Sequence, residues 1–342
     1  ARVISRRVIE VPNISAIPFG QYQDTTVTSN IRDSAGAIVE DDISSADALV
    51  VPPGGIATLL LPRGRLDWTA ASIRRAAFKL NSTQPVVAYQ FSPYCCNFSF
   101  SNDASLLFPT SSLGTSYRYI GPAHHQFFRA NPNDFFGCSG GSSCLDPNDV
   151  CVNNTCGRYS NESAMMTIVG AVDGTEVTVE LPPNQQVIGY QGVDSAPLTN
   201  TFEISLDAQD VAILPTVYRQ SNATDLTGAK LSSNKPFVVF SGHVCSFFPS
   251  TAFACDHLQE QLVPTSTWGS QYQLVPAAER GNNFPAEVVY WKVLSNEDGT
   301  TIGFSVPFNS LNSVGSSNPT MPDCGTRIGA DGNMILNAGE FC

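Results

Sequence analysis

The chain repeats part of its own sequence, and this repeat constrains the fold more than any other feature. The segment Lys79–Tyr89 returns, with similar residues at most positions, as Lys230–Phe240, 151 positions later. Each copy is followed by an apolar run that ends in Pro and then by the pattern Gly-x-x-Tyr, which ends at Tyr117 in the first copy and at Tyr272 in the second. Repetition at this spacing predicts two consecutive structural modules.

A second element, an Asp-x-Thr turn before β-branched residues, opens each copy. It occurs at Asp24–Val27, Asp173–Val177 and Asp298–Ile302. Asp accepts hydrogen bonds from backbone amides and Gly tolerates positive φ, so Asp-Gly-Thr favours a tight turn before a strand. The later segment Leu336–Glu340 matches Leu206–Asp210, which indicates the opening half of a third copy. We therefore expect an N-terminal arm at 1–23, β modules at 24–172 and 173–297, and a partial third module at 298–342.

Short runs rich in Val, Ile, Thr, Phe and Tyr recur between turn residues, and almost none continues into a helical period. We expect strands at Ile56–Leu61, Pro85–Phe91, Thr175–Leu181, Val211–Val217, Pro236–Ser241 and Val288–Leu294. Pro236 should begin its strand, because proline has no amide to donate to a ladder. Short helices are expected at Trp68–Ala77 and Cys255–Leu262. Without long helices between the strands, the pattern predicts an all-β protein of tandem β-sandwich-like modules.

The first module carries an insertion at 134–158. The distance from Pro109 to Asp173 is 64 positions, whereas the corresponding distance from Pro264 to Asp298 is 34. The inserted residues are rich in Gly, Ser and Asn and lack the apolar residues for a core. We expect two internal disulfides to hold this loop, and spacing leaves all three pairings open. The cysteines concerned are Cys138, Cys144, Cys151 and Cys156.

Cys245 and Cys255 could take part in either of two structures. With His243 and His257 they could complete a tetrahedral zinc site. Alternatively they form a disulfide that closes a hairpin, and we favour this reading because ten cysteines in a chain with four lysines are typical of an oxidising compartment. Metal analysis of the purified protein would decide between the two.

The remaining cysteines are expected in disulfides as well. Cys324 and Cys342 enclose a turn-rich loop and are expected to pair with each other. Cys95 and Cys96 are adjacent, and neighbouring side chains of a strand point to opposite faces, so these two need separate partners. A bond between modules or between molecules is one option for them.

Charge and the start of the chain restrict location and partners. The sequence has 18 basic and 30 acidic residues, a formal net charge of −12 that disfavours nucleic acid and anionic membrane surfaces. Because it also lacks an apolar run of about 18 residues, membrane insertion is not expected. The chain starts at Ala1 without a leader, which we interpret as a mature secreted form. Six sequons are candidate glycosylation sites: Asn13, Asn81, Asn97, Asn153, Asn161 and Asn222.

Catalytic and cofactor signals are weak, so an enzyme is not predicted. The chain has no nucleophile-elbow, zinc-protease, P-loop or dinucleotide fingerprint. Asp256 and Glu260 flank His257, but a solvated pair or N-terminal capping of a helical turn is the simpler interpretation. The His124-His125 pair is expected at the surface. Asp331–Asn333 and Asp146–Asp149 could offer oxygens to calcium without the full EF-hand pattern, so no cofactor is expected.

Several motifs of the second module carry a family resemblance. They are the run Gly228–His243, then Cys255-Asp256-His257, Pro264 and Trp268-Gly269; in the first module the related segments are 85–91 and 102–109. Together they resemble the IgGFc-binding protein N-terminal domain family, in the form seen in bacterial surface proteins. The resemblance extends from about Asp24 to Glu340 and implies an extracellular, protein-binding or adhesive module, which is often part of a longer chain. The four-cysteine insertion departs from the animal form of the domain.

We therefore expect an extracellular structural or adhesive module that binds proteins or glycans at a cell surface or in a matrix. The alternative is a subunit of a self-assembling filament or surface layer, in which Arg2–Pro12 adds as a strand to its own module or to a neighbouring molecule. The third copy ends at Cys342, before the strand that follows in both earlier copies, so either the chain was cut or another element supplies the missing strands. A secreted hydrolase, a third possibility, would require catalytic groups that converge in one cleft.

Overall fold

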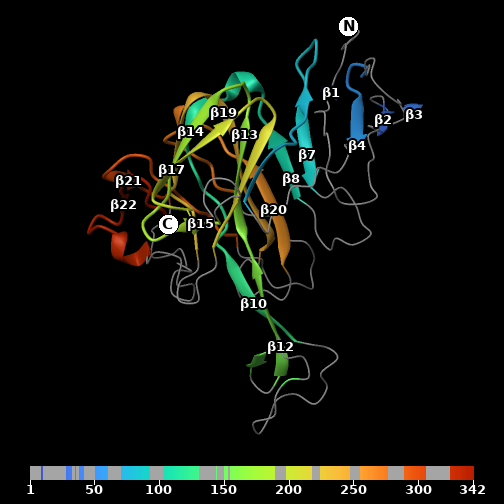
Figure 1. Cartoon of the computed structure of the whole chain (residues 1–342). Coiled ribbons are helices and arrows are strands. Elements are labelled where there is room, and N and C mark those ends of the chain that lie inside the picture. The colour runs from blue at the N-terminus through green and yellow to red at the C-terminus, as the bar shows by residue number, and fades with distance from the viewer. Residues whose placement is uncertain are drawn as a thin grey trace.

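The computed structural model is built almost entirely of β-strands (Figure 1). It describes residues 9–10, 28–32, 35, 38–41, 51–60, 71–92, 103–130, 144, 150–152, 155–188, 198–217, 224–246, 255–275, 289–305 and 324–342. Within these ranges the only helical elements are short 3-10 turns: η1 (Thr110–Ser112), η3 (Thr265–Thr267) and η5 (Cys324–Arg327). The expectation of an all-β protein is confirmed.

Eight strands form the largest sheet. They are β5 (Ser72–Arg75), β9 (Gly114–Arg118), β13 (Ala164–Gly170), β14 (Thr175–Glu180), β17 (Thr201–Leu206), β18 (Asp210–Pro215), β19 (Lys230–Ser246) and β20 (Asp256–Gln261). Smaller sheets contain β1 (Ile9–Glu10) with β6 (Lys79–Leu80), β2 (Thr28–Arg32) with β3 (Ile38–Asp41) and β4 (Ile56–Leu60), and β7 (Ala88–Ser92) with β8 (Asp103–Leu107). The others contain β10 (His125–Ala130) with β11 (Val150–Val152) and β12 (Thr155–Glu162), β15 (Gln186–Val187) with β16 (Leu198–Thr199), and β21 (Thr300–Ile302) with β22 (Met334–Leu336).

The 17-residue strand β19 organises the main sheet. Its N-terminal half pairs antiparallel with β14 and β9, and its C-terminal half pairs antiparallel with β13 and β20. Strands β17 and β14 extend the first half, whereas β13, β18 and β5 extend the second. A strand shared in this way by two groups of strands curls the sheet, so that one face can enclose a core (Figure 1).

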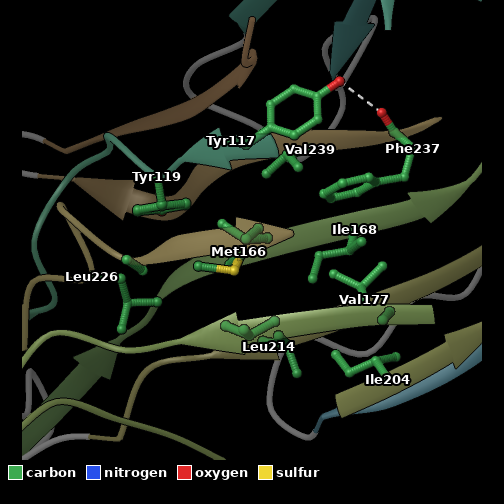
Figure 2. Close-up of a cluster of buried hydrophobic side chains, with 14 of the residues drawn as sticks. Tyr117, Tyr119, Met166, Ile168, Val177, Ile204, Leu214, Leu226, Phe237 and Val239 are labelled. Carbon is green, nitrogen blue, oxygen red and sulfur yellow. Dashed lines mark hydrogen bonds between the residues drawn. The ribbon is translucent and has the colours of Figure 1, made fainter. Parts of the chain in front are cut away.

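The core consists of side chains that alternate along the strands. Met166 and Ile168 on β13 and Val177 on β14 are buried (Figure 2). Val179, two residues further along β14, is buried as well, as the two-residue period of a strand dictates. Leu214, Leu226, Phe237 and Val239 belong to the same cluster. Burial of each such side chain stabilises the fold by about 1.5–3 kcal/mol, so this cluster is the main source of stability.

The expected boundary between residues 172 and 173 falls inside this sheet. It lies in the turn between β13 and β14, and both strands pair with β19. Strands β5, β9 and β13 come from before the boundary, and β14 and β17–β20 come from after it. The described residues therefore do not confirm a tandem arrangement of separate modules, because strands from both expected modules contribute to one sheet and one core.

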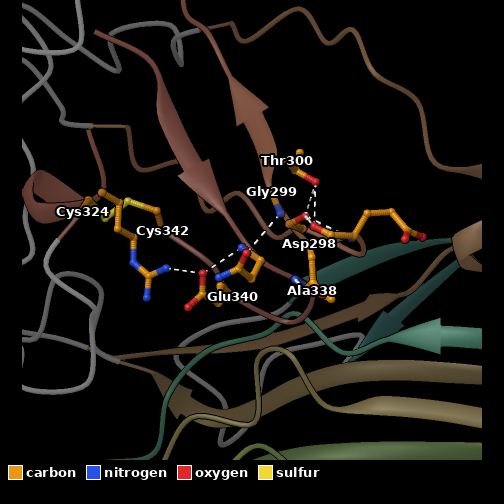
Figure 3. Close-up of polar contacts among 11 residues, drawn as sticks. Asp298, Gly299, Thr300, Cys324, Ala338, Glu340 and Cys342 are labelled. Carbon is orange, nitrogen blue, oxygen red and sulfur yellow. Dashed lines mark hydrogen bonds and ion pairs between the residues drawn. A yellow bond between two sulfur atoms is a disulfide. The ribbon is translucent and has the colours of Figure 1, made fainter. Parts of the chain in front are cut away.

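The Asp-Gly-Thr turns nevertheless have the same structure in two places. The amide of Gly174 donates to the Asp207 carboxylate, and the amide of Ala208 donates back to Asp173, each at 2.9 Å. The same exchange joins Gly299 to Asn337 at 3.1 Å and Ala338 to Asp298 at 2.9 Å (Figure 3). Both glycines have positive φ, 65° and 69°, which explains why glycine follows the Asp in each turn.

Two expected helices are wrong. Residues 72–75 of Trp68–Ala77 form β5, and residues 256–261 of Cys255–Leu262 form β20. Strand β5 pairs with β18, and β20 pairs with β19. These tertiary pairings override a weak local preference for helix. Pro236 also lies inside β19 rather than at its start, between the Ser232 and Phe237 pairings where the register with β9 shifts, which is a position that tolerates proline.

Candidate interaction surface

The hairpin of β7 and β8 presents apolar side chains to solvent. Val87, just before β7, is 76% exposed, and Tyr89 and Phe91 on the strand are 57% and 52% exposed. Residues two apart lie on the same face of a strand, so these three form one apolar strip. We call Val87, Tyr89 and Phe91 the β7 strip.

The opposite face of the hairpin is fastened to the main sheet. Gln90 donates from its side-chain amide to the side chain of Gln259 on β20 at 3.0 Å. On β8, the Asp103 carboxylate accepts from the amide of Gln259 at 2.7 Å, and Ser105 Oγ accepts from the amide of Gln261 at 2.9 Å. Gln261 in turn accepts from the amide of Phe108 at 2.8 Å. These contacts hold the β7 strip on a fixed support, which reduces the ordering cost of binding.

Two ionisable side chains lie on β20 behind the hairpin. Burial lowers the pKa of His257 below 6.5, although the Asp103 carboxylate acts in the opposite direction. Burial raises the pKa of Glu260 above 4.5, and Asp103 raises it further. Both shifts disfavour the charged form of the side chain, as expected for groups covered by a docked hairpin.

A second exposed segment follows η3. Tyr272 is 68% exposed, Leu274 43% and Val275 73%. No described strand pairs with residues 271–275. This segment is separate in sequence from the β7 strip and forms a second apolar feature of the described surface.

The residues proposed as alternative zinc ligands are arranged around a disulfide. Cys245 and Cys255 are bonded to each other, and His243 Nδ1 accepts from the amide of Cys245 at 3.0 Å. Within the described residues no three His, Cys, Asp or Glu side chains are grouped so as to hold a metal ion. The geometry is that of the hairpin disulfide favoured by the sequence.

The other cysteines fall partly within the described residues. Cys324 is bonded to Cys342 (Figure 3), and in the insertion Cys144 is bonded to Cys156. Cys151 faces Cys156 across the β11–β12 hairpin and is itself in a disulfide. Cys138, Cys95 and Cys96 lie outside the described residues.

Sequons and possible calcium ligands can be placed only in part. Asn81 is exposed and Asn161 lies on β12, whereas Asn13, Asn97, Asn153 and Asn222 are outside the described residues, as is Asp146–Asp149. The Asp331 carboxylate accepts from the amide and the side chain of Asn333 at 3.1 and 2.8 Å. These bonds close a local turn and lower the pKa of Asp331.

Lys292 forms a partly buried polar cluster that no motif in the sequence predicts. Its ammonium forms an ion pair of 2.7 Å with Asp225, which is buried, and donates to Thr227 Oγ1 at 2.7 Å and to the carbonyl of Gly121 at 2.9 Å. It also lies 4.3 Å from the centroid of the Phe341 ring. Because these three acceptors satisfy the Lys292 ammonium, we assign Lys292 a structural role. It joins the last part of the chain to Gly121, which follows β9, and to Asp225 and Thr227, which precede β19. No local motif marks a partner 67 positions away.

One expectation about histidine is wrong. His124 was expected at the surface but is buried, with its Nδ1 2.9 Å from Thr216 Oγ1. The amide of His124 also donates to the carbonyl of Thr224 at 2.8 Å. These contacts place His124 against Thr216 and Thr224, which lie far along the chain, so the sequence around His124 does not indicate its burial.

Fold and surface together define a class: a curled β-sheet protein with internal disulfides and exposed apolar segments. A family model described as IgGFc binding protein matches residues 103–318, more than half of the chain, and the chain belongs to this family. The human IgGFc-binding protein is 33% identical over 122 residues, which are 36% of this chain and 2% of that protein. The chain therefore corresponds to a very small part of that relative. No solved structure matches. In the described residues no helix is long and apolar enough to span a membrane.

Proposed function

We propose that this chain is an extracellular module that binds a protein or glycoprotein partner through the β7 strip. The observation that carries the proposal is the strip itself: three large apolar side chains, each more than half exposed, on a hairpin fixed to the main sheet. Family membership and the disulfides support an extracellular binding role rather than catalysis.

The strip has the composition of a binding hot spot. Aromatic side chains are enriched at the centres of protein interfaces, because they bury a large area at a small cost in conformational entropy. Exposed apolar side chains gathered on one fixed strand are a feature of interaction surfaces, whereas scattered ones are ordinary. The net charge of −12 favours partners with a basic rim, which would also accelerate association.

Binding is tested with the purified chain on a sensor surface. The first probe is an immunoglobulin Fc fragment, because the human relative is named for binding it. The second probe is a purified glycoprotein, which tests the glycoprotein alternative. We expect saturable binding of one probe that weakens at least tenfold in Tyr89→Ser and Phe91→Ser, corresponding to about 1.4 kcal/mol or more. Ile335→Ser is the control and should bind normally, because it changes an exposed apolar residue on β22, on the opposite side of the molecule from β7 (Figure 1). Saturable binding that is unchanged in both strip variants would refute the role of the strip.

A filament subunit is a second candidate, favoured by one observation. Strand β1 pairs with β6 through Ile9↔Leu80 and Glu10↔Lys79, a two-residue ladder that a neighbouring molecule could supply in its place. We propose that exchange of residues 1–12 between molecules joins subunits. Analytical ultracentrifugation should then show an apparent molar mass that rises with protein concentration and is lower after deletion of residues 1–12. A monomer of unchanged mass in both proteins would refute exchange.

A further inference from the structure

Two turns of the chain are copies of one local structure. Pro109 and Pro264 precede η1 and η3 with nearly equal backbone angles, φ −65° with ψ 154° and φ −65° with ψ 151°. After each turn a glycine amide donates to the hydroxyl of the tyrosine three residues later. The distances are 3.2 Å from Gly114 to Tyr117 and 2.9 Å from Gly269 to Tyr272. The equivalence of residues 109–117 and 264–272 is therefore structural as well as sequential.

The hairpins before these turns also correspond. Tyr89 pairs with Leu106 in the β7–β8 ladder, and Phe240 pairs with Gln261 in the β19–β20 ladder. These two pairs occupy equivalent positions of the sequence repeat, so the hairpins have the same register. The correspondence thus includes both hairpin strands, the turn and the tyrosine, and the second copy has four more residues between its two hairpin strands.

The copies differ in what happens after the turn. In the first copy the chain continues as β9, which pairs antiparallel with β19 through Tyr117↔Leu231 and Gly114↔Phe237. Tyr117 is fully buried, and its hydroxyl donates to the carbonyl of Phe237 at 2.7 Å. In the second copy residues 271–275 pair with no described strand, and Tyr272 is exposed.

The first turn is also more tightly packed than the second, as the surroundings of Gly114 and Gly269 show. A side chain at Gly114 would collide with Pro264, whose Cβ would be 2.5 Å away, so glycine is required there for close packing. At Gly269 the only described atoms within 4 Å of an added Cβ belong to Tyr272 itself, at 3.8 Å or more. At the second turn, no described residue other than Tyr272 occupies the space that corresponds to Pro264 at the first.

We propose that residues 269–275 are a docking strand for a partner strand of the same type as Lys230–Val239. The partner runs antiparallel to it and carries a polar stretch with lysine, then Pro, then a large apolar residue in the position of Phe237. Tyr272 packs against that apolar residue and donates its hydroxyl to the carbonyl there, as Tyr117 does to Phe237. Main-chain pairing supplies affinity, and the tyrosine contact fixes the register. This inference is independent of the β7 strip.

The probe is a fluorescein-labelled peptide with the sequence of residues 228–241, added to the full chain and followed by anisotropy. We expect saturable binding that weakens at least tenfold in Tyr272→Asp and is unchanged in Ile335→Ser, which changes an exposed apolar residue on β22 outside both proposed surfaces. A peptide with the Phe237→Asp substitution should not bind. Circular dichroism of Tyr272→Asp confirms folding, which its exposed position favours.

Two results would overturn the proposal. The first is absence of peptide binding up to about 1 mM, where even a contact of some −4 kcal/mol is detected, or equal binding by Tyr272→Asp. The second is a dimer of the full chain that depends on Tyr272 but that the peptide does not displace, because the occupant would then be a different surface of a second copy.

Discussion

The hydroxyl of Tyr117 donates a 2.7 Å hydrogen bond to the carbonyl of Phe237, 120 positions away, and the two rings meet edge to face with 4.8 Å between centroids (Figure 2). This contact joins β9, from before the expected module boundary, to β19, from after it. The contact therefore joins the two halves of the chain within one sheet, and its removal tests how much this joining contributes to stability.

Tyr117→Phe should lower the free energy of unfolding by about 1–2 kcal/mol, because the buried Phe237 carbonyl loses a donor while packing is kept. Urea denaturation measures the change. Tyr272→Phe is the matched control, and its exposed hydroxyl should make a difference within about 0.5 kcal/mol. Equal effects of the two substitutions would contradict the assigned burial.

Lys292→Met should cost about 3 kcal/mol of stability, because it leaves the buried Asp225 carboxylate without its cation. In a double-mutant cycle with Asp225→Asn the two costs should not add, since both substitutions remove one interaction. Lys230→Met is the control: its ion pair with Glu180 is nearly half exposed, so about 1 kcal/mol or less is expected. A fully additive cycle would show that Lys292 and Asp225 do not interact.

Removal of the turn carboxylates tests the two equivalent turns. Asp173→Ala and Asp298→Ala should each cost about 1 kcal/mol, because the amides of Ala208 and Ala338 lose their acceptor. Asparagine keeps an acceptor oxygen at that position, so the Asn variants should retain most of the stability. If Ala and Asn variants are equally destabilised, charge rather than the hydrogen bond accounts for the effect.

Because Cys245 and Cys255 form a disulfide, we expect stability to fall when both cysteines are replaced but not when metal ions are removed. Replacement of both cysteines by Ser should lower stability by about 2–4 kcal/mol, as expected for a short closed loop. Treatment of the unmodified protein with EDTA should leave its thermal midpoint unchanged. A shift of several degrees with EDTA, together with one zinc per chain by metal analysis, would restore the zinc interpretation of His243 and His257.

His257 should make the fold sensitive to acid. Its folded pKa lies below 6.5, so at pH values between the folded and unfolded pKa the unfolded chain binds the proton more readily. Its contribution to stability is therefore complete above about pH 6.5 and is lost as pH falls through the folded pKa. His257→Gln should flatten this part of the stability profile, measured by urea denaturation from pH 7 to 5, because glutamine binds no proton in either state.

Glu260 changes the pH dependence of stability in the opposite direction, so its effect must be distinguished from that of His257. Its raised folded pKa means that stability falls as pH rises through the range above 4.5. Glu260→Gln therefore serves as the companion variant. If the profile between pH 5 and 7 keeps its slope in His257→Gln but loses it in Glu260→Gln, the assignment to His257 is wrong.

The sequence predicted the strand class well, because alternation of apolar residues is a local signal. Thr175–Leu181 and Val211–Val217 differ from β14 and β18 by only one or two residues at their ends. The repeat also indicated which residues share a local structure, such as the two Gly-x-x-Tyr turns. It could not show that β9 of one copy completes the sheet of the other, because pairing partners are chosen by the whole fold.

The candidate surface was harder to predict than the strands. Pro85–Phe91 was expected as a strand, but its alternation alone does not tell which face meets the core and which meets solvent. That choice is made by the contacts of Gln90 and Asp103 with β20, more than 150 positions away in sequence. The ion pair of Lys292 with Asp225 escaped prediction for the same reason.

Binding through the β7 strip is tested most directly by hydrogen–deuterium exchange of the chain with and without its bound partner. We predict slower exchange at residues 88–92 and 103–107 in the complex, with little change at β14 and β17. Protection confined to other segments, with the β7–β8 hairpin unchanged, would contradict a binding role for the strip.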